Sequence, residues 1–432
     1  MVLKKFSSSL LLLLALLSGC GGGGDGTSDP SPSVANVQLT TSTQVAPVTV
    51  DTPAVVNPFQ TPQFETPTAI PVDKFRLAQL DYRYDTSKNQ FDINGHQTTS
   101  FESIKPAIDK IKQIGFTGIV VQFQTPINKH TGRISLYDTA NTDKTIPKDT
   151  WKLVEYIKSQ GLQVWLSLQI VDSDTDSLLT PDFNKYTEQS MFNNIIEYQR
   201  KIAITAEQYK VQGIFISEGN YNLESYEHLF YWQQLISEIR KVYSGKLSYT
   251  TSLMMPTSIW NHVDYASINM NSTLSKTPVY DLRSIVNLYF KDAYNNNQIQ
   301  LIKNFHMVYG KKFILITHPV ITDMGVGYIP STFWENVINN VWSNVFTPHT
   351  DKRMQLLKIT AFMEAVNKHL IDVTDGVGFG GYNPWLQDVN FSKPGTGIYH
   401  YYCCGVDLTN NTDAQKTINS YFSKQWGHHT IQ

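Results

Sequence analysis

The sequence predicts an α/β fold: a single (β/α)8 TIM barrel, preceded by a signal peptide and a flexible linker. From about residue 75 onward, short β-branched apolar runs alternate with longer stretches of helical periodicity along the 432-residue chain. This alternation is typical of a parallel sheet covered by helices. Eight such units follow one another, which is the number that closes a barrel. A doubly wound open sheet is the alternative, but it rarely needs eight regular units.

The individual elements follow from local patterns. Runs with the composition of buried parallel strands predict strands at Arg76–Arg83, Gly118–Gln124, Gln163–Val171, Gly213–Ser217, Lys246–Leu253, Tyr265–Asn271, Lys312–Thr317 and Gly376–Gly381. Helical spacing of apolar residues predicts helices at Ser103–Ile114, Pro147–Gln160, Gln189–Lys210, Tyr226–Tyr243, Val279–Val308, within Thr332–Leu370 and at Asp413–Trp426, with a short turn near Ile259. Gly115, Gly161 and Gly245 each stand before a strand, where a glycine commonly ends the preceding helix.

The first 19 residues predict a lipoprotein signal peptide. Lys4 and Lys5 precede the apolar run 10–17 and a small-residue cut site, in the order of a secretory signal. The run is too short to cross a bilayer, which needs about 20 residues. The stretch Leu17-Ser18-Gly19-Cys20 resembles the lipobox of bacterial lipoproteins, which implies that Cys20 is acylated and becomes the mature N-terminus. An ordinary cleaved signal with an incidental cysteine is the alternative.

Residues 20–73 are typical of a flexible linker, and residues 74–432 then form the folded domain. Gly, Ser, Thr, Pro, Val and Ala dominate the linker, and it contains no Lys or Arg. A coil of about 50 residues reaches roughly 40 Å, so the lipid would hold the barrel at the cell envelope. Gly21 is not the acidic residue that retains lipoproteins of enterobacteria in the inner membrane, which favours the outer membrane. Whether the domain faces the periplasm or the outside, and its oligomeric state, stay open.

Composition narrows the class of partner. The formal net charge of −2 argues against nucleic acid, which requires a basic footprint. Charged residues make up 17% of the chain and aromatic residues 12%, a balance that suits an uncharged polar ligand. We expect no metal or other cofactor, because the strand ends offer no His/Cys/carboxylate cluster at ligand spacing.

Two cysteines remain besides Cys20, and they are adjacent. Cys403 and Cys404 could form a strained vicinal disulfide in an oxidising compartment. Two buried thiols are an equal alternative.

Function in such a barrel gathers at the C-terminal ends of the strands. The candidate site residues there are Asp81, Gln122, Gln124, Asp172, Glu218, Asn220, Tyr221, Asn269, Asn271, His318, Asp323, Tyr382 and Trp385. Amide side chains both donate and accept hydrogen bonds, so they match sugar hydroxyls. Tyr382 and Trp385 offer flat apolar faces for a pyranose ring. The sequence therefore predicts a polysaccharide or oligosaccharide partner, although each of these residues could instead have a structural role.

Three stretches carry a resemblance to a known family: "WQQLISEIRKVYSGKLSYT" at 232–250, "WNHVDYASINMN" at 260–271 and "YGKKFILIT" at 309–317. They resemble the helix-to-strand 5 segment, strand 6 and strand 7 of the retaining (β/α)8 glycoside hydrolases, in particular the endo-β-mannanase-like family 113. The resemblance implies two carboxylates about 5–5.5 Å apart, an acid/base after strand 4 and a nucleophile after strand 7.

Both catalytic positions depart from the family pattern. Glu218 is the candidate acid/base, but it stands about one position early, and one position on a strand reverses a side chain. Where the family has Thr-Glu, this chain has Thr317-His318, and the next carboxylate is Asp323. Asp81 and Asp172 are further candidate carboxylates. Two hypotheses therefore stand: a membrane-anchored glycosidase, or a degenerate barrel that binds glycan or serves as a surface scaffold without hydrolysis.

Overall fold

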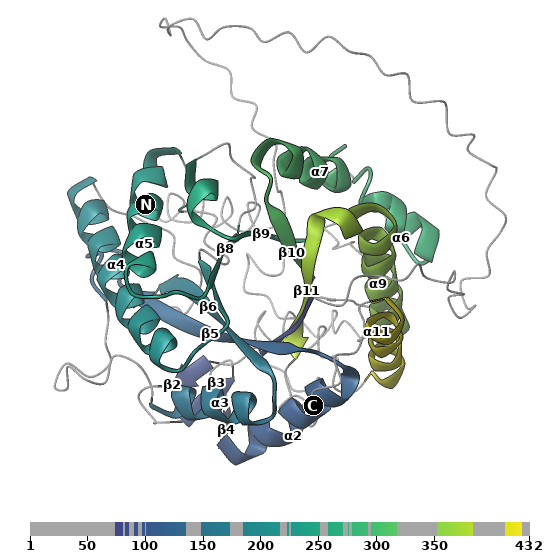
Figure 1. Ribbon diagram of the computed structural model, residues 1–432, viewed down its shortest axis with the longest axis horizontal. Helices are drawn as coiled ribbons and strands as arrows, with labels where there is room; N and C mark the ends of the chain where they lie inside the picture. Colours follow the sequence, from purple (N-terminus) through teal and green to yellow (C-terminus); the bar gives the residue numbers. More distant parts are fainter. Residues whose placement is uncertain are drawn as a thin grey trace, which may run out of the picture.

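The computed structural model confirms the predicted fold class. The structure describes residues 74–80, 83–85, 90–93, 97–99, 101–134, 148–172, 185–216, 223, 226–250, 258–270, 275, 279–292, 295–317, 352–382 and 411–425. Within these residues, eight parallel strands close into one barrel, with helices between the strands (Figure 1). The proposed signal peptide, Cys20, the linker, Cys403 and Cys404 lie outside the described residues.

The barrel strands run in chain order around the closed sheet, β1-β5-β6-β7-β8-β9-β10-β11 and back to β1. Their bounds are β1 Phe75–Leu80, β5 Gly118–Ile127, β6 Gln163–Asp172, β7 Gly213–Ile216, β8 Lys246–Thr250, β9 Tyr265–Asn269, β10 Lys312–Thr317 and β11 Thr374–Tyr382. Because all are parallel, their C-terminal ends share one end of the barrel.

Helices surround the barrel, as Figure 1 shows for a view through the ring of strands. The α-helices are α2 Phe101–Ile114, α3 Lys148–Ser159, α4 Lys185–Gln208, α5 Leu229–Arg240, α6 Leu282–Leu288, α7 Gln298–Tyr309, α9 Lys352–Ala365 and α11 Thr412–Gln425. Shorter turns are η2 Tyr226–His228, η3 Ser258–His262, the π-helical η4 Val366–Leu370 and η5 Ile371–Val373. Among the described helices, none is both long and apolar enough to span a membrane.

Alternate residues of each strand face opposite sides of the sheet and form two separate cores. Outward residues pack against the helices: Tyr249 of β8 makes edge-to-face contacts with Trp232 and Trp260, with ring centroids 5.8 and 5.4 Å apart. Inward residues at the N-terminal end of the barrel form an aromatic cluster in which the Trp165 ring lies 5.1 Å from Phe75 and 5.0 Å from Phe215. The barrel is therefore filled at this end.

A small second sheet was not predicted. β2 (Arg83–Asp85), β3 (Gln90–Ile93) and β4 (Gln97–Thr99) form a three-stranded antiparallel sheet between β1 and α2. It follows the C-terminal end of β1 and contacts β5. The prediction of one strand through Arg83 was therefore wrong, because the barrel strand ends at Leu80 and a separate strand begins at Arg83.

The single helix predicted over Val279–Val308 was also wrong, since the segment forms two helices, α6 and α7. α6 ends at Leu288, and Asn295, which precedes α7, adopts a left-handed φ of 64° that an α-helix does not contain. Asn297 then caps α7, because its side chain accepts a hydrogen bond of 2.9 Å from the backbone N–H of Gln300. The apolar periodicity is similar in both helices, so it did not indicate where α6 ends and α7 begins.

Of the three glycines predicted to end a helix, two are confirmed and one is wrong. Gly115 and Gly161 have φ values of 100° and 77°, the left-handed conformation that ends a helix. Gly245 has no positive φ and lies beyond the end of α5, so the helix-end assignment for this residue was wrong. A Cβ on Gly245 would lie 2.2 Å from the hydroxyl oxygen of Tyr243, so the glycine makes room for that ring.

Candidate functional site

The inward face of the barrel changes from apolar to polar toward the C-terminal ends of the strands. On β1 Leu77 is followed by Gln79, on β5 Val120 by Gln122, and on β9 Tyr265 by Asn269 after Ser267. Side chains two residues apart on a strand share a face. The same strands therefore carry apolar side chains at the N-terminal end of the barrel, which we call its floor, and polar side chains toward the C-terminal end.

Small hydroxyl side chains form the middle tier. Ser167 of β6, Ser248 and Thr250 of β8, and Ser267 of β9 are all buried and inward-facing. Their hydroxyl oxygens make no hydrogen bond to another described residue.

Amide side chains form the upper tier. Gln122, Gln169 and Asn269 are partly exposed at the C-terminal ends of β5, β6 and β9, whereas Gln79 of β1 is buried below them. Two of the sequence-predicted residues, Gln122 and Asn269, therefore share one end of the barrel, where they were expected. Gln79 was missed, although its place two residues after Leu77 on the same strand was a sufficient signal.

Asp81, Glu218, Asn220, Tyr221, Asn271, His318, Asp323 and Trp385 lie outside the described residues. Gln124, Asp172 and Tyr382 lie within strands β5, β6 and β11, but their side chains are outside the description. The roles assigned to these residues stay predictions.

Leu223, which follows β7 in the chain, is buried and contacts residues of η2 and α5. β7 ends at Ile216, and Leu223, the next described residue, is fully buried. The carbonyl oxygen of Leu223 accepts a hydrogen bond of 2.9 Å from the indole N–H of Trp232 and lies 3.0 Å from Nδ1 of His228. The six residues between Ile216 and Leu223 include Glu218, Asn220 and Tyr221.

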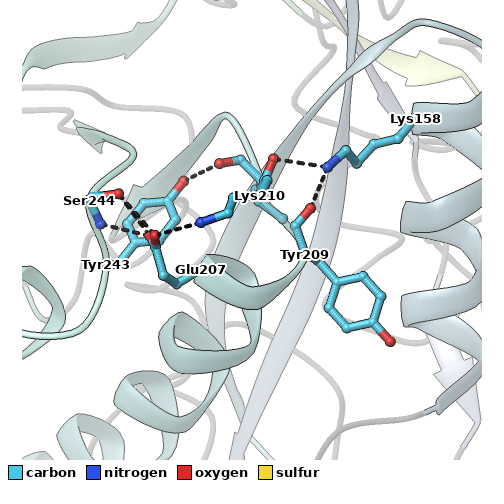
Figure 2. Close-up of polar contacts among 7 residues, drawn as sticks. Lys158, Glu207, Tyr209, Lys210, Tyr243 and Ser244 are labelled. Carbon is cyan, nitrogen blue, oxygen red and sulfur yellow. Dashed lines mark hydrogen bonds and ion pairs between the residues drawn. The ribbon is translucent and has the colours of Figure 1, made fainter.

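A second polar network lies at the opposite, N-terminal end of the barrel, where helices end and strands begin (Figure 2). Glu207 at the end of α4 accepts hydrogen bonds from the backbone N–H and the hydroxyl of Ser244 and from Lys210. The hydroxyl of Tyr243 donates to the carbonyl of Val211 at 2.9 Å. This network joins α4 to the turn before β8, so it stabilises the fold.

Two carboxylates at this end have a lowered pKa. The backbone N–H and hydroxyl of Ser244 hold the pKa of Glu207 below its ordinary value. Burial opposes ionisation of Asp264, but the backbone N–H of Leu247 and the guanidinium of Arg240 outweigh it, so the pKa of Asp264 is also lowered. Gln122, Gln169 and Asn269, the rim amides at the other end of the barrel, carry no charge and can both donate and accept hydrogen bonds.

The described residues contain no group of three or more His, Cys, Asp or Glu side chains that could hold a metal ion. Three inward, partly exposed side chains at the C-terminal ends of the strands, Gln122, Gln169 and Asn269, are amides, which are suited to hydroxyl-rich ligands.

Comparisons with known proteins agree with this geometry. The model of Glycoside Hydrolase Family 113 matches residues 91–341. A structure described as a complex of a GH113 β-1,4-mannanase is 15% identical, with a TM-score of 0.54, and covers 83% of this chain and 100% of its own. The GH113 β-mannanase of Alicyclobacillus acidocaldarius in complex with ManMIm is 12% identical, with a TM-score of 0.54, and covers 82% of this chain and 98% of its own. At these identities the structural likenesses show the fold. No curated protein sequence matches the chain.

Proposed function

Because the chain belongs to glycoside hydrolase family 113, we propose that it engages a β-linked polysaccharide, with β-1,4-linked mannan as the first candidate, at the C-terminal end of its barrel. Family membership implies a polysaccharide or oligosaccharide substrate. The choice of mannan is supported by the β-1,4-mannanases that share the fold.

The observation that carries the proposal is the upper tier of inward amides. Gln122, Gln169 and Asn269 come from three strands and are all partly exposed at the barrel end where function gathers in this fold. Each amide offers a donor and an acceptor to adjacent sugar hydroxyls. The hydroxyl tier beneath them keeps the inner wall polar.

Hydrolysis is the first form of this function. Glu218 follows the end of β7 by two residues, and the proposed mechanism uses it as the acid/base that protonates the leaving glycosidic oxygen. A retaining mechanism needs a second carboxylate about 5–5.5 Å away as nucleophile, and an inverting one needs it about 6.5–9.5 Å away with a water between. Asp323, Asp81 and Asp172 are the candidates for this partner.

Binding without hydrolysis is the second form, and one observation favours it. β10 ends at Thr317, and the next residue is His318 rather than a carboxylate. A lone carboxylate cannot be nucleophile and acid in the same step. A barrel that keeps the amides and lacks the second carboxylate would hold a glycan without cleaving it.

One experiment separates the two forms. The full-length wild type and Glu218→Gln are incubated with soluble β-1,4-mannan, and both reducing-end release and retardation in mannan-containing gels are measured. Release that falls at least about a hundredfold in Glu218→Gln supports hydrolysis with this acid/base. Retardation without release by the wild type supports binding alone. If the wild type shows no release of reducing ends and no retardation on mannan, the proposed ligand is contradicted.

We also propose that Cys20 anchors the chain to the cell envelope, in the outer membrane where the cell has one. The proposal is supported by the lipobox-like stretch ending at Cys20 and by the linker composition that follows it. Replacing Cys20 by Ser should move the protein from the membrane fraction to the soluble fraction and abolish incorporation of labelled palmitate. Equal membrane association of Cys20→Ser and wild type would contradict the anchor.

A further inference from the structure

Three buried hydroxyl side chains line one wall of the barrel interior, on the neighbouring strands β8 and β9. Ser248 and Thr250 share the inward face of β8 because they are two residues apart, and Thr250 is paired in register with Ser267 of β9. The three side chains are 0%, 1% and 0% exposed, and we call them the hydroxyl stripe. Asn269, two residues after Ser267, continues the same face to the partly exposed rim.

Apolar side chains flank the hydroxyl stripe on both sides. Phe215 of β7 is paired in register with Ser248, and Ile314 of β10 is paired with Ser267. Both belong to the inward apolar cluster, so their side chains neither donate nor accept hydrogen bonds. The three hydroxyl oxygens make no hydrogen bond to any other described residue. Since β8 and β9 each lie between two other strands, their backbone N–H and C=O groups pair within the sheet.

The burial of these hydroxyls requires a hydrogen-bonding partner. Burying a hydroxyl without a hydrogen bond costs free energy, and folded proteins satisfy such groups with another protein group or with bound water. An internal water molecule needs two to four polar partners. The hydroxyl stripe supplies three neighbouring groups, each of which both donates and accepts.

The spacing of the hydroxyl stripe fits water. Register partners on neighbouring strands lie about 4.8 Å apart, which is too far for a direct hydrogen bond between Thr250 and Ser267. One water with bonds of about 2.8 Å to each hydroxyl spans that separation. Ser248 lies about 6.6 Å along the strand from Thr250, so it needs a further water. Bulky branched side chains usually fill these barrel layers, and a serine side chain is smaller than any of them.

We propose that the hydroxyl stripe is a binding site for internal water, which holds about two ordered molecules between the floor of the barrel and the rim. One water bridges Thr250 and Ser267, and the next joins this pair to Ser248. The site lies beneath the rim amides, so its waters extend the polar surface of that end of the barrel into the interior. The inference concerns the barrel wall alone and does not depend on a glycan as ligand.

The test compares the full-length wild type with Thr250→Val and Ser267→Ala, and with the control Thr360→Val. Thr360 is an equally buried threonine of α9, but its hydroxyl donates to the carbonyl of Leu356 at 2.8 Å. Oxygen-17 and deuterium magnetic relaxation dispersion counts the internal water molecules that exchange slowly with solvent, and urea unfolding follows stability. Valine is close to threonine in shape, so Thr250→Val removes the hydroxyl without opening a cavity.

We expect Thr250→Val and Ser267→Ala each to lose about one slowly exchanging water, because the bridging molecule then keeps too few polar partners. The urea midpoint of Thr250→Val should fall, since its loss leaves the other groups of the site unsatisfied. Thr360→Val should also lower the midpoint but keep every internal water.

A dry hydroxyl stripe gives the opposite result, because removing an unsatisfied buried hydroxyl raises the urea midpoint. A higher midpoint in Thr250→Val would therefore overturn the proposal. An unchanged number of slowly exchanging waters in both stripe variants would overturn it as well, and so would the same loss of water in Thr360→Val.

Discussion

The ring of Trp165 occupies the space that Gly213 leaves on the neighbouring strand. The two residues are paired in register between β6 and β7, and a Cβ built on Gly213 would lie 2.3 Å from Cζ3 of the indole. The largest inward side chain of the barrel floor thus fits because the residue beside it has no side chain. This pairing explains how four aromatic residues share one end of the barrel.

Replacing Gly213 by Ala should destabilise the barrel by about 1–3 kcal/mol, because neither the ring nor the strand can move far in a filled core. Urea unfolding would measure the loss. Gly378→Ala is the matched control: its Cβ would lie 3.1 Å from a methylene carbon of Ile316, so the loss should be smaller. In a Trp165→Leu background the Gly213→Ala effect should shrink, and equal effects in both backgrounds would argue against the proposed clash.

Replacing Tyr243 by Phe should cost about 1–2 kcal/mol, because the buried hydroxyl donates to the carbonyl of Val211 at 2.9 Å. The control is Tyr209→Phe. Figure 2 shows the Tyr209 hydroxyl pointing away from this network, and among the described residues it makes no hydrogen bond. Thermal or urea unfolding of both variants distinguishes them, and an equal loss in the two would contradict the role of the Tyr243 hydroxyl.

Acidification should weaken the Arg240–Asp264 contact. Nη2 of Arg240 lies 2.5 Å from Oδ2 of Asp264, and the pKa of Asp264 is lowered in the folded state. A carboxyl with a lowered folded pKa contributes stability above its unfolded pKa of about 4, and this contribution is lost as the pH falls through the folded pKa. Asp264→Asn should therefore lose about 1 kcal/mol at pH 7 and less at pH 3. The exposed Asp413→Asn serves as control, and a pH-independent loss in Asp264→Asn would refute the assignment.

Raising the pH above about 8 should increase the stability of the folded chain through Lys358. Burial lowers the pKa of this α9 side chain to about 8. Between about pH 8 and 10 the unfolded chain binds a proton that the folded chain does not, so stability rises with pH by up to roughly 3 kcal/mol. Lys358→Met should flatten this rise, whereas Lys416→Met, at an exposed position of α11, should keep it. Identical slopes in wild type and Lys358→Met would show that burial does not shift this titration.

The rim amides Gln122 and Gln169 should matter for ligand affinity and not for folding. Gln169→Ala and Gln122→Ala should each weaken mannan affinity by about 5- to 10-fold, as loss of one or two hydrogen bonds implies, with little change in unfolding free energy because both side chains are partly exposed. Asn304→Ala, on the exposed face of α7, should leave both quantities unchanged. Gel retardation and urea unfolding measure the two effects, and intact affinity in both rim variants would place the ligand elsewhere.

The barrel was predictable because its strands have a strong local signature. β10 occupies the predicted residues 312–317, and β6 extends one residue past its predicted end. The errors arose where the local sequence pattern fits more than one secondary structure. The apolar spacing of 279–308 fits one helix as well as two, so it does not reveal that α6 ends at Leu288 and that α7 begins at Gln298.

The candidate site was predictable in part. The alternation along β5 and β9 is sufficient to place Gln122 and Asn269 on the inward face at the C-terminal end. No alternation predicts that His228 meets Glu188, because the two residues are 40 positions apart in the chain and belong to different barrel units. Such contacts depend on how α4 and α5 pack beside each other.

By itself, the sequence determined the number and order of the barrel units, the face of each strand and the end of the barrel where polar groups gather, since these depend on periodicity within single segments. Only the tertiary structure decided which residues meet: Trp165 with Gly213 across two strands, and His228 with Glu188 across two helices. The physical reason is that such contacts are set by the register and packing of segments far apart in the chain, which local propensity does not encode.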